Sequence, residues 1–427
     1  MITVGLDFGT HQTKICIEER KGYETHYKFH KFRDLEGRMQ YTLPSILCIT
    51  PEGRLKYGFV GNVDGGIYKR YFKQAVYRDT DSPGMTLWEA ARYSIWYLAY
   101  LLFDLEDVYG KMFTIQMGAP SDSSGIDDRK AIAVSLIASA YRLVEDVFRN
   151  DKCAFLQATY DKLVEVTEIV KFSESVKKNY GVLVFPEAYA CLMPLVGRGK
   201  IAHGMSLVVD IGGGTTDISF FTIEEKEENS GIYHPQVYDF FSINKGLNYL
   251  TESTDSMHKD VIDMMRFFSA DNIKMERVKV YYDEIYRICQ HLTSNLKREY
   301  SKQTELYMHR LTDALKYRPI IYTGGGSTIK LLQKDYMGFC DQQLISYDSW
   351  KSKEFDDKEL FADPRLCPVL STAYGLSISV KNDVIVKKPF RDIFSEMRGL
   401  REEPVKSNFG GATESGFDYG LDYDAWK

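Results

Sequence analysis

A run of three glycines between two short apolar segments carries the strongest chemical signal in the 427-residue chain. Apolar, β-branched residues on either side of Gly212, Gly213 and Gly214 predict a β-hairpin with a tight turn. Because glycine has no Cβ, the main-chain N–H groups of such a turn can approach an anion and form a cradle for phosphate. Thr215 and Thr216 add hydroxyl groups beside the same anion.

Two carboxylates flank this turn, Asp210 before it and Asp217 after it. Hard cations take oxygen ligands and Mg²⁺ usually keeps several waters, so this pair can hold a hydrated magnesium ion. An ordinary hairpin with solvated acids would show the same pattern. The turn taken alone therefore does not decide between a binding site and a plain hairpin.

The same arrangement occurs near the N-terminus, where an apolar segment ending at Asp7 is followed by a turn at Gly9 and Thr10 and by another apolar segment. Two such hairpins, about 200 residues apart, indicate an internal duplication with the phosphates of a nucleotide clamped between the halves. A third glycine turn, at residues 324–326, also follows an apolar segment. None of the three turns has the glycine pattern of a dinucleotide-binding motif or of a P-loop.

Together, the three glycine turns and the acids Asp7, Asp210 and Asp217 at these separations resemble the actin/heat-shock ATPase superfamily, which includes actin-like filament proteins, sugar kinases and heat shock protein 70 chaperones. The resemblance covers roughly residues 2–380. It implies that ATP or ADP binds with Mg²⁺ in a cleft between two lobes, the three aspartates holding Mg²⁺ through waters. The nucleotide-binding residues that it implies are Gly9, Thr10, His11, Gly212, Gly213, Gly214, Thr215, Gly246, Lys297, Ser301, Gly324, Gly325 and Gly326.

The resemblance also implies catalytic roles for Lys69, Glu187, Asp210 and Thr215. Lys69, next to Arg70, resembles the chaperone lysine that reaches the γ-phosphate and the attacking water, although a solvated helix face would look the same. Glu187 begins a helix where the superfamily has an acid that orients the water, but an acid there also complements the helix dipole. Phosphoryl transfer to water depends mainly on charge stabilisation and on the position of the water.

Three positions depart from the chaperone pattern. Ser294 stands where the family has a glutamate, and Thr328 stands where it has an arginine that stacks on adenine, so the preference for adenine stays open. His11 replaces a second threonine of the first turn. A neutral His11 would donate a hydrogen bond to phosphate, and a charged one would raise the affinity for phosphate.

The hydrophobic pattern predicts the α/β class, with strands over residues 1–60, including one over 42–49. A capping box of Thr86 and Glu89 predicts the start of a helix that runs to about Tyr109. The resemblance refines this class to duplicated ribonuclease H-like lobes with a helical lid subdomain. The expected parts are lobe I at 1–195 with a helical insertion at about 151–180, lobe II at 196–385 with the lid at about 247–310, and a disordered tail at 386–427.

Composition limits the partners and the compartment. A net charge of −6 argues against a dedicated nucleic-acid binder. The seven cysteines are scattered without a C-x-x-C pair, which favours a reducing cytoplasm over a disulfide or zinc framework. The longest apolar run, residues 95–103, is far shorter than the roughly 20 residues of a membrane-spanning helix. We therefore expect a cytoplasmic protein that binds neither nucleic acid nor membrane.

The function favoured by the sequence is that of a heat shock protein 70-like ATPase that lacks the substrate-binding domain and acts in trans on an unknown partner or client protein. An actin-like, ATP-dependent filament protein is the alternative. A small-molecule kinase of the same superfamily is less favoured, because it would need an acceptor site with a catalytic base that the sequence does not show.

Overall fold

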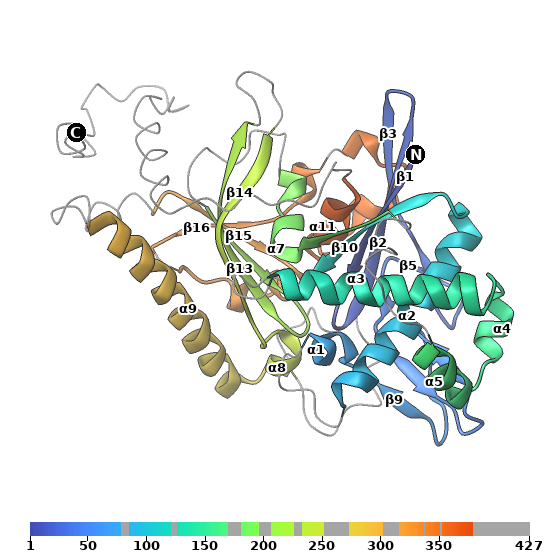
Figure 1. Cartoon of the computed structure of the whole chain (residues 1–427). Coiled ribbons are helices and arrows are strands. Elements are labelled where there is room, and N and C mark those ends of the chain that lie inside the picture. Colours follow the sequence, from blue (N-terminus) through green and yellow to red (C-terminus); the bar gives the residue numbers. More distant parts are fainter. Residues whose placement is uncertain are drawn as a thin grey trace, which may run out of the picture.

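A computed structural model describes residues 1–77, 85–120, 126–169, 181–195, 206–225, 233–251, 273–301, 316–336, 338–350 and 352–378 (Figure 1). This part of the chain is mixed α/β, as the sequence predicts at the level of fold class. Two large sheets dominate it, and the helices α7 (Glu187–Ala190) and α11 (Leu366–Ser377) lie between them in Figure 1.

The first large sheet has the strand order β11-β10-β1-β2-β3. Its strands β1, β2 and β3 are antiparallel neighbours, whereas β1, β10 and β11 run parallel. A short strand, β6, pairs with the beginning of β2. The bounds are β1 (Ile2–Phe8), β2 (Gln12–Lys21), β3 (Glu24–Phe29), β6 (Leu43–Pro44), β10 (Phe113–Ala119) and β11 (Val182–Pro186).

The second large sheet has the order β14-β13-β12-β15-β16 and repeats the pairing directions of the first sheet. Strands β12, β13 and β14 are antiparallel neighbours, and β12, β15 and β16 run parallel. The hairpin β12–β13 therefore holds the same place in its sheet as β1–β2 does in the first. The bounds are β12 (Ser206–Ile211), β13 (Thr216–Glu225), β14 (Tyr233–Ile243), β15 (Pro319–Thr323) and β16 (Asp341–Leu344).

Two small sheets complete the strands of the described chain. The strand predicted over 42–49 is broken into β6 and β7. At the break, the Ser45 hydroxyl donates to the carbonyl oxygen of Gly9 at 2.7 Å, so this segment is tied to the first glycine turn instead of continuing straight. The small sheets consist of β4 (Phe32–Arg33) with β5 (Met39–Gln40), and of β7 (Leu47–Ile49) with β8 (Leu55–Tyr57) and β9 (Ile67–Lys69).

Helices α2 (Leu87–Tyr109) and α3 (Ile126–Arg142) pack on one face of the first sheet. The predicted capping box of Thr86 and Glu89 is present and begins α2. The chain after α3 forms a π-helical turn (Leu143–Val147) and then α4 (Lys152–Gln157) and α5 (Tyr160–Ile169). The helical insertion expected at about 151–180 is thus interrupted at Ala158, whose backbone is extended, and residues 170–180 lie outside the described residues.

Of the remaining helices, α1 (Phe72–Val76) packs beside α2 in the core of the first sheet, and the others cover a face of one or the other large sheet. One face of the second sheet packs on α8 and α9, and β3 packs on the aromatic segment around Trp350 and on α11. Of the expected lid, α8 and α9 are described and residues 252–272 and 302–310 are not; the expected tail at 386–427 also lies outside the described part. These helices are α1 (Phe72–Val76), α8 (Leu247–Thr251) and α9 (Met275–Ser301), with 3₁₀ turns at Met193–Leu195, Gly325–Thr328, Lys330–Leu332, Tyr347–Ser349, Ser352–Glu354 and Glu359–Ala362.

Helix α11 follows the second sheet in sequence but packs on the first, and it comes very close to its neighbours. A Cβ added to Gly375 would lie 1.8 Å from the carbonyl oxygen of Ala190, the last residue of α7. A Cβ added to Gly5 in β1 would lie 2.2 Å from the backbone nitrogen of Ser377. These two glycines permit the close backbone contacts of α11 with β1 and with α7.

We predict that Gly375→Ala lowers the free energy of unfolding by about 3 kcal/mol, because the obstructing atom is backbone and cannot rotate away. Gly22→Ala is the matched control. Gly22 has a φ of +64° but open space around its Cβ position, so its substitution should cost only about 1 kcal/mol of backbone strain. Urea unfolding measures both variants, and equal losses would contradict the packing role of Gly375.

Candidate functional site

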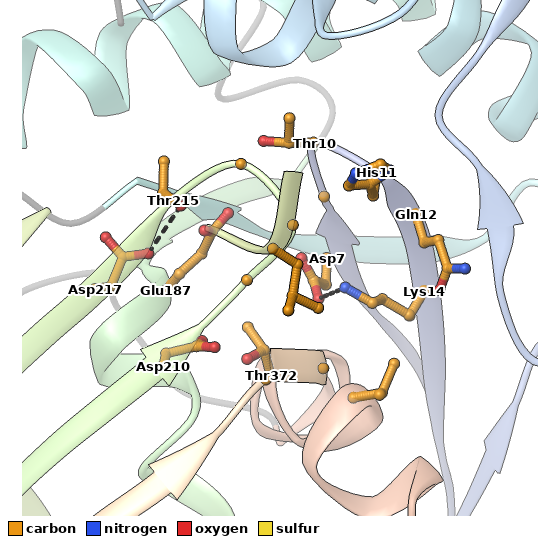
Figure 2. Close-up of a pocket in the computed structure, with 18 of the residues that line it drawn as sticks. Asp7, Thr10, His11, Gln12, Lys14, Glu187, Asp210, Thr215, Asp217 and Thr372 are labelled. Atoms are coloured by element: carbon orange, nitrogen blue, oxygen red, sulfur yellow. Dashed lines mark hydrogen bonds and ion pairs between the residues drawn. The ribbon is translucent and has the colours of Figure 1, made fainter. Parts of the chain in front are cut away.

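The turns of the two glycine hairpins face each other across a cleft (Figure 2). The cleft is open to solvent, and the space inside it together with its mouth is about 840 Å³. Its lining residues are Asp7, Gly9, Thr10, His11, Gln12, Lys14, Lys73, Glu187, Asp210, Gly212, Gly213, Gly214, Thr215, Asp217, Leu247, Gly324, Gly325, Pro368, Val369 and Thr372.

The two turns touch each other, and glycine makes this contact possible. A Cβ added to Gly213 would lie 2.2 Å from Cδ2 of His11, and one added to Gly214 would lie 2.6 Å from Cγ2 of Thr10. Within the second turn, the N–H of Gly212 donates to the carbonyl oxygen of Thr215 at 2.9 Å. The side chains of the first turn therefore rest directly on the bare backbone of the second.

Gly246 and Gly324, two of the other predicted glycines, pack against the second glycine turn and the end of β12. The N–H groups of Leu247 and Asn248 donate to the carbonyl oxygens of Gly212 and Gly213, and a Cβ added to Gly246 would lie 2.6 Å from either oxygen. Gly324 lines the cleft with a φ of +81°, and its Cβ would lie 2.2 Å from Oδ1 of Asp210.

Gly325 lines the cleft beside Gly324. Gly326 lies behind the cleft wall, where its Cβ would lie 2.3 Å from Cγ2 of Ile211, the last residue of β12. Gly246 is not among the lining residues either. Gly246 and Gly326 are therefore packing positions, whereas Gly324 and Gly325 form part of the cleft surface.

Four carboxylates line the cleft, from Asp7 near the end of β1, Asp210 in β12, Asp217 in β13 and Glu187 at the start of α7. Asp7, Glu187 and Asp217 are all buried. Figure 2 shows all four side chains around the space between the two turns, Asp7 from the first sheet, Asp210 and Asp217 from the second and Glu187 from α7. The duplicated strand order explains the convergence, since β1 and β12 are corresponding strands that bring their acids to corresponding ends.

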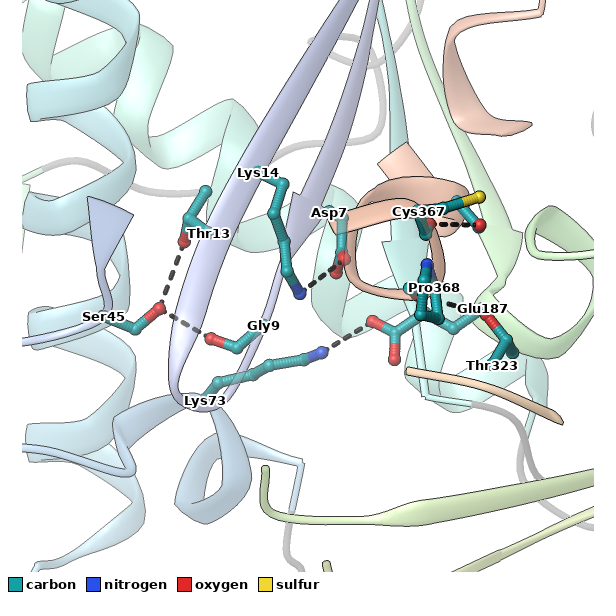
Figure 3. Close-up of polar contacts among 11 residues, drawn as sticks. Asp7, Gly9, Thr13, Lys14, Ser45, Lys73, Glu187, Thr323, Cys367 and Pro368 are labelled. Atoms are coloured by element: carbon teal, nitrogen blue, oxygen red, sulfur yellow. Dashed lines mark hydrogen bonds and ion pairs between the residues drawn. The ribbon is translucent and has the colours of Figure 1, made fainter. Parts of the chain in front are cut away.

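Two ammonium groups, that of the partly buried Lys14 and that of the buried Lys73, are paired with these acids (Figure 3). Nζ of Lys14 lies 2.8 Å from Oδ2 of Asp7, and Nζ of Lys73 lies 2.6 Å from Oε1 of Glu187. The pKa of Lys73 is raised: burial acts to lower it, but the negative charges of Glu187 and Asp7 outweigh burial. Lys73 is therefore a charged group held inside the cleft wall.

The remaining two acids have no such cation beside them. Burial, together with the charges of Asp7 and Glu187, raises the pKa of Asp210 to about 7. Burial and the charges of Glu187 and Asp210 raise the pKa of Asp217 well above its usual value. In the ligand-free protein Asp210 and Asp217 therefore keep their protons to higher pH than ordinary aspartates, and a bound cation would favour their charged forms.

The acids suit a hydrated cation better than a directly ligated one. Within the described residues, no three His, Cys, Asp or Glu side chains lie close enough to hold a metal ion between them. Oδ1 of Asp217, however, is buried without a hydrogen-bond partner, which is costly for a carboxylate. Waters on a Mg²⁺ ion can reach such an oxygen without a direct three-acid cluster.

The structure does not bring Lys69 to the cleft. Lys69 ends β9 and its Nζ lies over the ring of Tyr93, 5.6 Å from the centroid. Lys73, four residues later, is the lysine beside Glu187. Lys297 and Ser301 belong to the last turns of α9, and their side chains lie outside the described part of the structure.

Seven of the lining residues were not predicted from the sequence, and only the strand pattern of β2 could have indicated any of them. Lys14 alternates with Gln12 along β2, and a strand period of two places both on one face. The other missed residues belong to segments far from β2 in the sequence, and no local pattern connects them to the site. The missed residues are Gln12, Lys14, Lys73, Leu247, Pro368, Val369 and Thr372.

The imidazole of His11, in the first glycine turn, is uncharged in the ligand-free protein. Burial and the positive charges of Arg70 and Lys14 hold its pKa well below the usual value. Its ring meets the ring of Tyr71 edge-on, with centroids 5.8 Å apart and an interplanar angle of 87°. The neutral form expected to donate a hydrogen bond is thus the form present in the ligand-free protein.

Comparisons with models of protein families and with curated proteins find no match for this chain. No described helix combines the length and apolar character needed to span a bilayer. The functional argument therefore depends on the geometry of the cleft.

We predict that Asp210→Asn stabilises the ligand-free protein at pH 8 by up to about 4 kcal/mol, because a rise in pKa from about 4 to about 7 costs about 1.4 kcal/mol per pH unit. Between the ordinary Asp pKa of about 4 and the raised value of about 7, the folded protein holds a proton that the unfolded chain has released. Wild-type stability therefore falls as pH rises through this window, and asparagine removes that fall.

Urea unfolding between pH 4 and pH 8 measures this effect. Asp341→Asn, at an exposed position of β16, is the control and should leave the pH profile unchanged. Parallel profiles for wild type and Asp210→Asn would show that Asp210 does not titrate as its surroundings require.

Proposed function

We propose that this protein is a Mg²⁺-dependent ATPase that works as a heat shock protein 70-like switch on a partner protein supplied in trans. One observation carries the proposal: two glycine turns, at equivalent places in two sheets of equal topology, meet across a cleft with an excess of carboxylates. Such turns suit phosphate, and the uncompensated acids suit its magnesium counter-ion.

We also propose the finer fold, in which the two sheets are the cores of duplicated ribonuclease H-like lobes at 1–195 and 196–385. The identical strand order and pairing directions support this duplication. The positions of α7 and α11 support it as well, since α7 follows the first sheet and contacts β13, while α11 follows the second sheet and contacts β1. In this fold α8 and α9 belong to the lid expected at about 247–310.

Phosphate groups would be bound by backbone N–H groups within residues 10–11 and 213–215, since the N–H groups of Gly9 and Gly212 already donate within their own turns. Nζ of Lys14 lies 3.2 Å from the Cβ position of Gly9, so its charge is beside the first turn. Asp7, Asp210 and Asp217 would hold Mg²⁺ through waters, and the ion would supply positive charge to phosphate oxygens. The hydroxyl of Thr215 donates to Asp217 at 3.4 Å and keeps that carboxylate turned toward the second turn.

Glu187 would orient the attacking water. Its Oε1 is fixed by Lys73, so the carboxylate cannot rotate freely, and its second oxygen can accept a hydrogen bond from water. Lys73 would also offset the charge that develops on the transferred phosphoryl group. We therefore assign to Lys73 the role at the γ-phosphate and the attacking water that the sequence resemblance implied for Lys69.

The proposal leaves the base of the nucleotide less well specified than the phosphates. The hydroxyl of Thr328, at the position of the family's stacking arginine, donates to the carbonyl oxygen of Gly325 at 2.8 Å. Thr328 thus stabilises the third glycine turn and adds no stacking surface. ATP is the proposed substrate and ADP the product that remains in the cleft.

We predict that Lys73→Ala lowers ATP turnover by about 100-fold or more, because Glu187 loses its partner and the cleft loses a positive charge. Lys69→Ala is the matched control and should keep turnover within about twofold, since Lys69 lies outside the cleft. Phosphate release measures turnover, and thermal melting of each variant shows whether it folds. An equal loss in both variants would contradict the assignment of Lys73.

Sedimentation separates the switch from its structural alternative. The switch account predicts that the protein stays in the supernatant at micromolar concentration with Mg²⁺ and ATP. An actin-like protein would form filaments under these conditions and pellet at high speed, with Asp210→Asn remaining soluble. An ATP-dependent pellet would therefore favour the filament function over the switch.

A further inference from the structure

Tyr71 has a backbone conformation that is unusual for its residue type. Its φ of 61° and ψ of 15° lie in the left-handed region, which bulky residues seldom adopt. Tyr71 stands between β9 and α1, and its carbonyl oxygen accepts the N–H of Ala75 at 3.0 Å. The residue therefore makes the turn that begins α1.

The turn at Tyr71 separates two lysines, of which only Lys73 lines the cleft. Directly after it, Phe72 is fully buried against the rings of Phe8 and Tyr97, with centroids 6.0 Å and 5.5 Å away. Lys73 then reaches Glu187, whereas Lys69 before the turn does not line the cleft. The left-handed residue thus directs Phe72 into the core and Lys73 into the cleft.

The ring of Tyr71 connects the same turn to the glycine hairpins. It meets the ring of His11 edge-on at 5.8 Å, and the guanidinium of Arg70 lies 5.3 Å from its centroid. His11 in turn lies against Gly213 of the opposite hairpin. One continuous set of contacts therefore runs from the second glycine turn through His11 and Tyr71 to the helix that carries Lys73.

We propose that Tyr71 is a positioning residue that couples occupancy of the first glycine turn to the placement of Lys73. This inference rests on the proposed ATPase function and deepens it. A phosphate bound at the turn contacts His11, and any shift of the imidazole is passed to the Tyr71 ring. Because that ring belongs to the residue that turns the chain, the shift changes the direction in which Lys73 points.

The strained backbone makes the coupling effective. A left-handed non-glycine residue persists only where its surroundings over-determine it, and such strain concentrates at functional sites. Here the surroundings are the His11 contact, the buried Phe72 and the Lys73–Glu187 pair. Loss of the Tyr71 ring removes the first of these restraints and leaves Lys73 less well held.

A double-mutant cycle in turnover tests the coupling. Tyr71→Ala should lower kcat by about 10-fold or more and change KM for Mg-ATP by less than about twofold, because a misplaced catalytic group affects chemistry more than binding. Tyr71→Phe keeps the ring and should retain wild-type kcat. In the Lys73→Ala background, Tyr71→Ala should cause no further loss.

A merely structural Tyr71 would lower kcat by the same factor with or without Lys73, and that result would overturn the inference while leaving the ATPase function intact. A wild-type protein that neither binds nor hydrolyses Mg-ATP would overturn both. The contact itself is checked on the free protein by NMR, with the His11 ring-proton resonance assigned from its loss in His11→Gln. That resonance should shift in Tyr71→Ala and hold in Tyr71→Phe, and an unshifted signal in Tyr71→Ala would contradict the contact.

Discussion

Repulsion among four carboxylates in one partly buried cleft is the physical constraint on which the rest of the site depends. Lys14 and Lys73 pair with Asp7 and Glu187, whereas burial and the neighbouring charges raise the pKa of Asp210 and Asp217. Buried ion pairs contribute little net stability because both partners lose hydration. The cluster is therefore unlike an arrangement that stabilises the empty protein, and it is well suited to a ligand that brings a cation with it.

The fold explains how these acids come together. Two sheets with the same strand order each present a hairpin whose turn reaches the cleft, and α7 and α11 pack between the sheets so that the turns face each other. Glycines at 213 and 214 let the side chains of the first turn rest on the second. Gly375 allows α11 to pack directly against the backbone of α7.

Local sequence patterns were sufficient for the parts of the site that lie on the hairpins. Strand–turn–strand patterns predicted Asp7, Asp217 and the glycine turns, and residues of all three turns line the cleft together with both aspartates. Lys73 could not be found in this way, because its direction depends on the left-handed backbone of Tyr71, which no periodicity reports. The break at Ser45 likewise depends on a contact with Gly9 that is distant in sequence.

Calorimetric titration with ADP, with and without Mg²⁺, tests the central claim that the cleft is a magnesium–nucleotide site. The account predicts one nucleotide bound per chain, an affinity at least about tenfold higher with Mg²⁺, and loss of binding in Gly213→Val, whose side chain would collide with His11. Binding that is indifferent to Mg²⁺ or unaffected by Gly213→Val would contradict it, as would the absence of binding by the wild-type protein.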